Sequence, residues 1–108
     1  MPKNLKIIDV GVFDNCSSLT SLILPDGLEE IAEFAFRNCY TLSDVTIPKS
    51  ISKINYSIFA NCRALKAIKF NGTKQEYKDS VLVDDPSWRR ANSALTRIKC
   101  LDGDIKLL

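Results

Sequence analysis

Three of the four cysteines in this sequence stand at a constant interval, and cysteine thiolates can bind metals or take part in redox reactions. Cys16, Cys39 and Cys62 are evenly spaced and lie far apart along the chain. Structural zinc sites use cysteines in close pairs, about two to four residues apart, so this spacing does not indicate zinc. A stack of small buried thiols is the better interpretation. We expect free thiols, because parallel neighbouring side chains point the same way and a disulfide would distort them.

The other residue types form no complete catalytic constellation. Histidine is absent, so the commonest general base and the commonest metal ligand are both missing, and Cys100 has no base to activate it. Asp102 and Asp104, together with Asp84 and Asp85, could hold Ca²⁺, but Asp-Gly-Asp is far from an EF-hand loop and is typical of a turn. The four glycines are isolated, so no phosphate-binding loop is present. We therefore predict no enzymatic activity, no cofactor and no metal site.

The composition is that of one ordinary globular domain with a weak charge asymmetry. The 108 residues are 45% apolar and 26% charged, with a formal net charge of +2. Residues 1–54 carry five basic and seven acidic side chains, and residues 55–108 carry ten and six. We interpret this mild basic bias as a solvated face and predict no nucleic-acid partner. No apolar run reaches the roughly 18 residues of a membrane span, and Met1–Asn4 begins no signal peptide.

The dominant pattern is an internal repeat of constant length. Three repeats extend over residues 2–24, 25–47 and 48–70, and each opens with a proline. One such unit cannot bury its own apolar residues, whereas stacked units bury a continuous ladder. We therefore expect residues at equivalent positions to lie above one another. Besides the cysteines, the recurring positions are Ile8/Ile31/Ile54, Phe13/Phe36/Phe59, Asn15/Asn38/Asn61, Leu19/Leu42/Leu65, Leu22/Val45/Ile68 and Leu24/Ile47/Phe70.

Spacing within each repeat predicts its local structure. Alternating residues such as Leu22 and Leu24 indicate a strand, and equivalent strands of successive repeats should pair in parallel about 4.8 Å apart. The aliphatic pair Leu28 and Ile31 suits a second short extended segment. The stretch that ends in Asn-Cys suits a single helical or 3₁₀ turn. We interpret the asparagine before each repeated cysteine as a turn residue or as part of a stacked amide row, not as a ligand contact.

The repeat resembles the BspA-type leucine-rich repeat family, whose signature is P-x-S-V-T-x-I-G-x-x-A-F-x-x-C-x-x-L-x-x-V-x-I. The third repeat matches it from Pro48 to Ile68, and the second matches it from Ala35 to Leu42. The family's glycine is replaced by Asp9, Ala32 and Asn55, a departure that concerns the tightness of one turn.

This resemblance implies a right-handed, mainly β solenoid of short parallel strands with short helical or 3₁₀ turns. It also implies a surface or secreted location and adhesion, because family members are surface proteins of bacteria and some protozoa that bind host proteins, matrix proteins or other cells.

Residues 71–108 leave the period and are predicted to form an α+β C-terminal cap. Thr73 and Glu76 have the spacing of a capping box, which predicts a short helix from about residue 74 to residue 79. Ser87 is expected to cap a second short turn that carries Trp88.

The end of this cap carries a hairpin signal. Asp102-Gly103 predicts a two-residue turn between strands over residues 97–101 and 104–107. In the predicted register Cys100 faces Ile105 and Ile98 faces Leu107. The apolar side of the hairpin could then cover the last repeat.

The outward positions of the main strands are the candidate partner-binding residues, because repeat proteins bind partners on such curved sheet faces. We predict a non-catalytic protein-binding or adhesion module, with a structural spacer that has no binding site of its own as the alternative. The candidate residues are Ser21, Ile23, Asp44, Thr46, Ala67 and Lys69.

The first repeat has no preceding layer over its apolar side chains. Leu5, Val12 and Phe13 are among the residues that this leaves uncovered. We therefore expect either a terminal fragment of a longer array or self-association through the uncapped N-terminal repeat.

Overall fold

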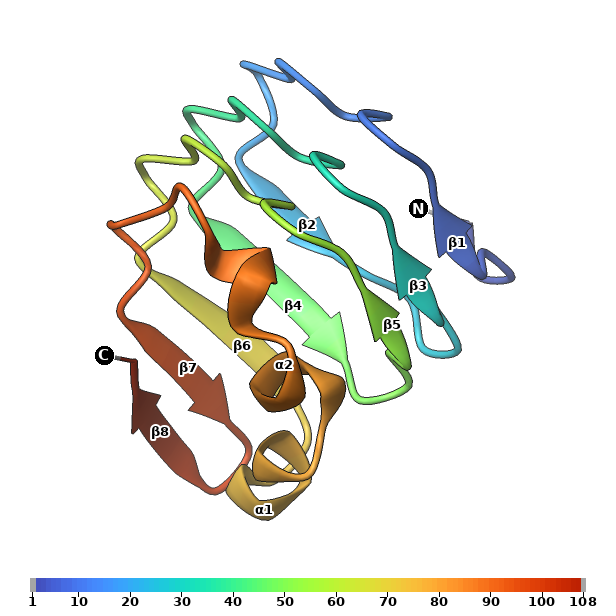
Figure 1. Cartoon of the computed structure of the whole chain (residues 1–108), viewed down its shortest axis with the longest axis vertical. Coiled ribbons are helices and arrows are strands. Elements are labelled where there is room, and N and C mark those ends of the chain that lie inside the picture. The colour runs from blue at the N-terminus through green and yellow to red at the C-terminus, as the bar shows by residue number, and fades with distance from the viewer. Residues whose placement is uncertain (1, 108) are drawn as a thin grey trace.

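The protein is described here by a computed structural model that covers residues 2–107. Short strands in two sheets make up most of the regular structure, and helices are few (Figure 1). The smaller sheet consists of β1 (Ile7–Ile8), β3 (Glu30–Ile31) and β5 (Lys53–Ile54). The larger sheet has the order β2, β4, β6, β7, β8. Its strands are β2 (Ser21–Ile23), β4 (Asp44–Pro48), β6 (Ala67–Asn71), β7 (Arg97–Cys100) and β8 (Gly103–Lys106).

The period of the sequence repeat sets the register of both sheets. In the smaller sheet Ile8 pairs with Ile31, and Ile31 pairs with Ile54, in parallel strands. In the larger sheet Leu22 pairs with Val45 in the same way. Each residue therefore lies beside the residue one repeat later, which confirms the predicted parallel pairing of equivalent positions.

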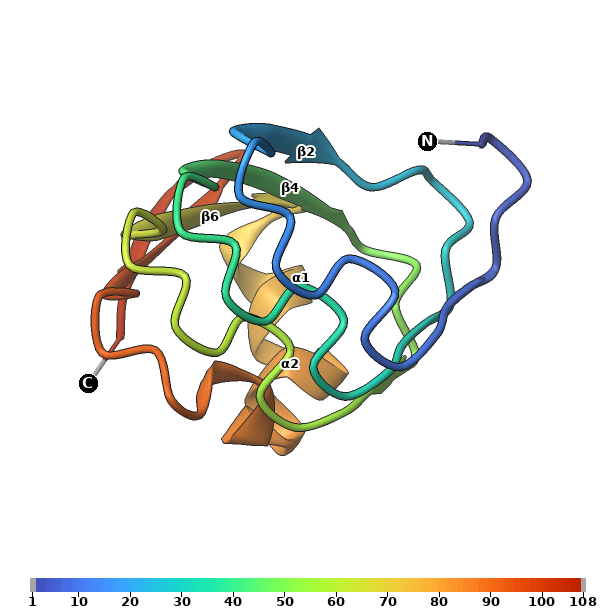
Figure 2. The ribbon, with the colours of Figure 1, turned by 90° about the horizontal axis from the view of Figure 1, so that it is seen from above.

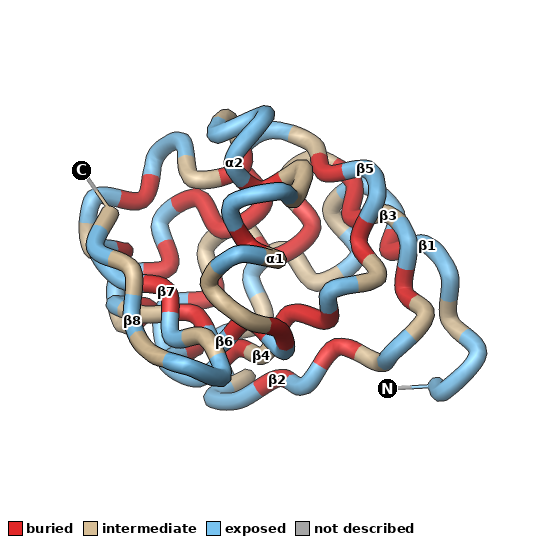
Figure 3. The backbone as a smooth tube through the Cα atoms, turned by 90° about the horizontal axis from the view of Figure 1, so that it is seen from below, coloured by how far each residue is buried: buried red, intermediate tan, exposed pale blue. Residues whose placement is uncertain are grey.

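The core is built from columns that take one side chain from each turn of the chain. The ring of Phe36 lies 5.2 Å from that of Phe13 and 5.5 Å from that of Phe59, with interplanar angles of 5° and 16°. Trp88, which is fully buried, ends this column with an edge-on contact to Phe59 at 6.4 Å. The phenylalanines form the single predicted column. Figure 2 shows the successive turns of the chain from above, and Figure 3 shows buried stretches, in red, alternating with exposed ones along the chain.

The segment before each repeated cysteine is a series of turns and not a helical turn. Asn15, Asn38 and Asn61 have φ angles of 62°, 61° and 59°, a left-handed conformation that asparagine tolerates and that ends helical geometry. The Nδ2 of Asn61 donates to the Oδ1 of Asn38 at 3.0 Å. The predicted helical or 3₁₀ turn is therefore wrong, whereas the predicted role of asparagine as a turn residue is confirmed at all three positions. The predicted amide row is confirmed only between Asn38 and Asn61.

Residues 86–100 form a fourth turn that the sequence period did not reveal. Strand β7 pairs in parallel with β6 and places Ile98 opposite Ile68. These two residues are separated by more than the length of one repeat. Two helices, α1 (Lys74–Lys78) and α2 (Val81–Asp84), lie between these strands in the chain, and the 3₁₀ helix η1 (Pro86–Arg89) follows. The added residues break the spacing but not the stacking.

Asn92 occupies the position of the repeated cysteine in this fourth turn. The Cys62 thiol donates to the carbonyl oxygen of Phe36 at 3.0 Å. The Nδ2 of Asn92 donates to the carbonyl oxygen of Phe59, one repeat further on, at 3.1 Å. The ladder thus continues with an amide in place of a thiol.

Two local predictions for the C-terminal segment need correction. Asp85, and not Ser87, caps η1, because its carboxylate accepts from the backbone N–H of Ser87 at 3.1 Å. The hairpin between β7 and β8 pairs Cys100 with Gly103 and Ile98 with Ile105, a shift of two positions from the predicted register. The capping box of Thr73 and Glu76 at the start of α1 is present as predicted.

Candidate partner-binding face

The larger sheet turns alternate residues outward, and all six predicted binding residues lie on that outward side. On β2, Ser21 and Ile23 are exposed on either side of the buried Leu22. Ser21 pairs with Asp44, and Ile23 pairs with Thr46. The alternation of the pleated strand therefore brings equivalent residues of successive repeats into adjacent rows.

The third strand completes these rows. Lys69 of β6 pairs with Thr46, so Ile23, Thr46 and Lys69 form one continuous row across three strands. Ala67 lies two residues earlier on the same face of β6 and is half-buried. Ile23 is 74% exposed, which leaves a large aliphatic side chain at the edge of this face with little to cover it.

Two shallow hollows adjoin this row. One, of about 180 Å³, is lined by the three residues of β2, by Asp44 and Thr46 of β4, and by Lys69 of β6. The other, of about 310 Å³, shares Thr46 and Lys69 and extends over Lys99 to Leu101, which is 70% exposed. The face therefore combines exposed aliphatic side chains with hollows that a partner's side chains could fill.

Charge on the face is partly compensated. The Nζ of Lys69 lies 3.3 Å from the Oδ1 of Asp44, and the Nη1 of Arg97 lies 3.3 Å from the Oδ2 of Asp104. These side chains are all more than two-fifths exposed, so each ion pair contributes little to stability. Lys99 lies opposite Lys69 and adds positive charge to the same row.

Lys99 and Arg97 were missed in the sequence-based list of candidates. They belong to β7, and the hairpin prediction treated that strand as a cover for the last repeat and not as a further strand of the same sheet. The signal that could have found them is the motif Leu95-x-x-Ile98, which repeats the Leu-x-x-aliphatic spacing of the first three turns.

Two of the three repeated cysteines, Cys39 and Cys62, are buried, and Cys16 is partly buried. Burial raises the pKa of the Cys62 thiol to about 12, and burial likewise raises the pKa of Cys39 and Cys100. All four cysteines are free thiols. Because the thiolate is the reactive form, Cys39, Cys62 and Cys100 are poor nucleophiles at neutral pH. Across residues 2–107, no cluster of three or more histidine, cysteine, aspartate or glutamate side chains is placed to hold a metal ion.

Short parallel strands that recur at a constant interval, with one broad exposed sheet face, define a repeat protein. The chain matches the family described as "BspA type Leucine rich repeat region (6 copies)" over residues 1–97. The protein belongs to this family of leucine-rich repeat proteins, as its repeat signature indicated. No curated protein and no solved structure matches the chain significantly.

Membership of this family supports a protein-interaction repeat, in a family that is generally non-enzymatic and typically surface-associated. The match extends beyond residue 70 and reaches into β7. Among the described residues, no helix has both the length and the apolar character to cross a membrane.

Proposed function

We propose that this protein is a non-catalytic protein-binding module, and that its partner docks on the outward face of the larger sheet. The observation that carries the proposal is the row of Ile23, Thr46 and Lys69, which adjoins two hollows on an exposed surface. Leucine-rich repeats use such faces for partners, since stacked strands present many side chains on one rigid surface.

We propose further that the chain is a right-handed leucine-rich repeat solenoid in a surface or secreted protein with a role in adhesion. Residues 2–24, 25–47 and 48–70 serve as its repeats, and residues 71–108, which include the fourth turn, serve as the C-terminal cap. The family's typical surface association supports this location and role.

The charged pair on the face offers a direct test of the binding proposal. The variants D44K and K69E each reverse one charge of the pair and so place like charges side by side on the face. Each should abolish the capture of a partner protein from cell-surface or matrix extracts. The double variant D44K/K69D restores the ion pair, so a loss of capture in that variant reflects recognition and not stability.

A matched control lies on the smaller sheet. Glu30 and Lys53 are also an ion pair between neighbouring strands, with Oε2 and Nζ 3.8 Å apart, so E30K changes charge by the same amount away from the proposed face. We expect E30K to retain capture. Capture that survives D44K, K69E and E30K alike would favour the alternative, a structural spacer whose parent protein binds elsewhere.

The first turn supports a proposal about assembly. Ile7, Val10 and Val12 are 50%, 56% and 55% exposed, and β1 and β2 form edges of their sheets. We propose that this end associates with a second copy or with a further repeat of the same kind, because both would continue the apolar columns. Light scattering at increasing concentration tests the first form, and a monomer at all concentrations would exclude it.

A further inference from the structure

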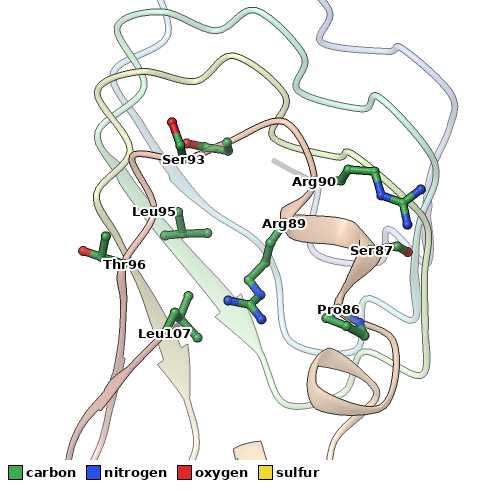
Figure 4. A pocket seen from close by; sticks show the side chains of 9 residues that line it. Pro86, Ser87, Arg89, Arg90, Ser93, Leu95, Thr96 and Leu107 are labelled. Atoms are coloured by element: carbon green, nitrogen blue, oxygen red, sulfur yellow. The ribbon is translucent and has the colours of Figure 1, made fainter.

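A pocket of about 470 Å³ opens beside the fourth turn, among η1, the loop that follows it, and the adjoining ends of β7 and β8. Its wall is partly aliphatic, through Leu95 and Leu107, and partly polar, through the hydroxyl groups of Ser93 and Thr96. None of the residues that line it belongs to the proposed partner-binding face. Figure 4 shows the guanidinium of Arg89 reaching into the space between Leu107 and Pro86.

Two adjacent arginines, Arg89 and Arg90, differ in their surroundings. Both residues line the pocket, but Arg90 is exposed and its side chain extends in a different direction from that of Arg89 (Figure 4). Hydrogen bonds from Ser87 lower the pKa of the Asp85 carboxyl, and the charge of Arg90 lowers it further, so Arg90 has an acidic neighbour. Arg89 is half-buried, and no described residue forms an ion pair with it.

The Nε of Arg89 is buried and has no hydrogen-bond acceptor among residues 2–107. A buried donor without an acceptor is unfavourable, because it has lost its water and gained nothing in return. The wall near it offers aliphatic carbon and neutral hydroxyls but no carboxylate. Among residues 2–107, the pocket wall therefore offers no carboxylate to this guanidinium.

We propose that this pocket binds a carboxylate carried on a short aliphatic group, as at the C-terminal residue of a peptide. The two Nη groups of an arginine form a planar pair of donors that fits the two oxygens of a carboxylate. Leu95 and Leu107 supply contacts for an aliphatic side chain, and Ser93 can donate a further hydrogen bond.

N-acetyl-leucine and N-acetyl-leucinamide are suitable probes, because they share an aliphatic body and only the first carries a carboxylate. We expect the acid to bind in an NMR titration and to shift the Arg89 Nε–Hε resonance, and the amide to bind about tenfold more weakly or not at all. Equal binding of the two probes by the native protein would overturn the proposal, whatever happens to any variant.

The variants R89Q and R63Q form a matched pair of charge removals, because Arg63 is exposed and does not line the pocket. R89Q should weaken binding of N-acetyl-leucine by about tenfold or more, and R63Q should leave the Kd within about twofold. Similar effects of the two variants would mean that net charge alone attracts the probe, which would refute a specific site. The melting temperature of each variant checks that it remains folded.

A chain extended by a few residues beyond Leu108 provides a last control. We expect the same Kd for N-acetyl-leucine in the extended and the native chain, since the ligand supplies the carboxylate. Binding that appears only in the extended chain would mean that the chain's own terminal carboxylate occupies the pocket, and this would overturn the proposal. Neither outcome depends on Asp44 or Lys69, so the site can fail or succeed independently of the partner-binding face.

Discussion

Replacement of Asn92 tests whether the fourth turn continues the ladder of the first three. This residue is 9% exposed, and its Nδ2 donates to the carbonyl oxygens of Phe59 at 3.1 Å and Cys62 at 3.3 Å. Its Oδ1 accepts from the backbone N–H of Ala94 at 3.1 Å. Alanine would remove all three hydrogen bonds and leave a small cavity.

The expected loss follows from these contacts. A typical hydrogen bond contributes about 0.5–1.5 kcal/mol, so three of them predict a loss of roughly 3 kcal/mol in the free energy of unfolding for N92A. Cysteine at this position should restore one donor, because the Cys62 thiol makes the equivalent bond to Phe36 at 3.0 Å. We therefore expect N92C to lose only about half as much as N92A.

Urea unfolding followed by circular dichroism measures both values, provided that the slope of free energy against urea stays constant. The exposed Asn71 serves as a control, and N71A should change stability by less than about 0.5 kcal/mol. The reasoning fails if N92A loses less than about 1 kcal/mol, or if N92C is no more stable than N92A. The second result would mean that the cysteine and asparagine positions are not equivalent.

Three further predictions follow from the core and the caps. Phe36 is fully buried between two stacked rings, so F36A should lose about 4 kcal/mol in the same urea assay, and a loss below about 2 kcal/mol would contradict the stacked column. Since burial raises the pKa of Cys62 to about 12, this thiol should resist iodoacetamide at pH 8 in the folded protein and react after denaturation, as mass spectrometry can detect. The pKa of Glu76 is lowered by the backbone N–H of Thr73 and then by Lys49, so its carboxylate stabilises the fold above its unfolded pKa of about 4.5 and ceases to do so as the pH falls below that value. The melting temperature of E76Q should therefore fall less steeply with pH below 4.5 than that of the native protein, and parallel curves would refute this linkage.

The predictable parts of the fold are those in which the same packing requirement recurs in every repeat. Phe13, Phe36 and Phe59 recur at one interval because each fills the same layer of a stacked core, and the interval alone sets the strand register. The outward position of the six candidate residues follows from the same register and the alternation of a strand. Asn61 was predictable as a turn residue, because its type suits a positive φ.

The fourth turn was not predictable from the period, because α1 and α2 lengthen the chain between β6 and β7 beyond the spacing of the first three turns. The stacking survives because the paired strands constrain where each turn meets its neighbour, and the loop between them tolerates added residues. A search for cysteine at the expected place fails as well, since Asn92 performs the same hydrogen bonding. Lys99 and Arg97 were consequently absent from the sequence-based candidate face.

The hairpin register shows how a distant contact overrides a local signal. Asp-Gly favours a two-residue turn, but the Asp102 carboxylate accepts from the backbone N–H of Lys74 at 2.8 Å, at the start of α1. The backbone N–H of Leu101 also donates to the carbonyl oxygen of Gly72 at 2.9 Å. Both bonds hold the loop against α1 and place Leu101 and Asp102 in the turn. The register moves by two positions, an even number, so every side chain of β8 keeps its predicted face. The packing of the hairpin thus survives an error in its turn, because burial constrains the face of a strand more strongly than turn chemistry constrains its register.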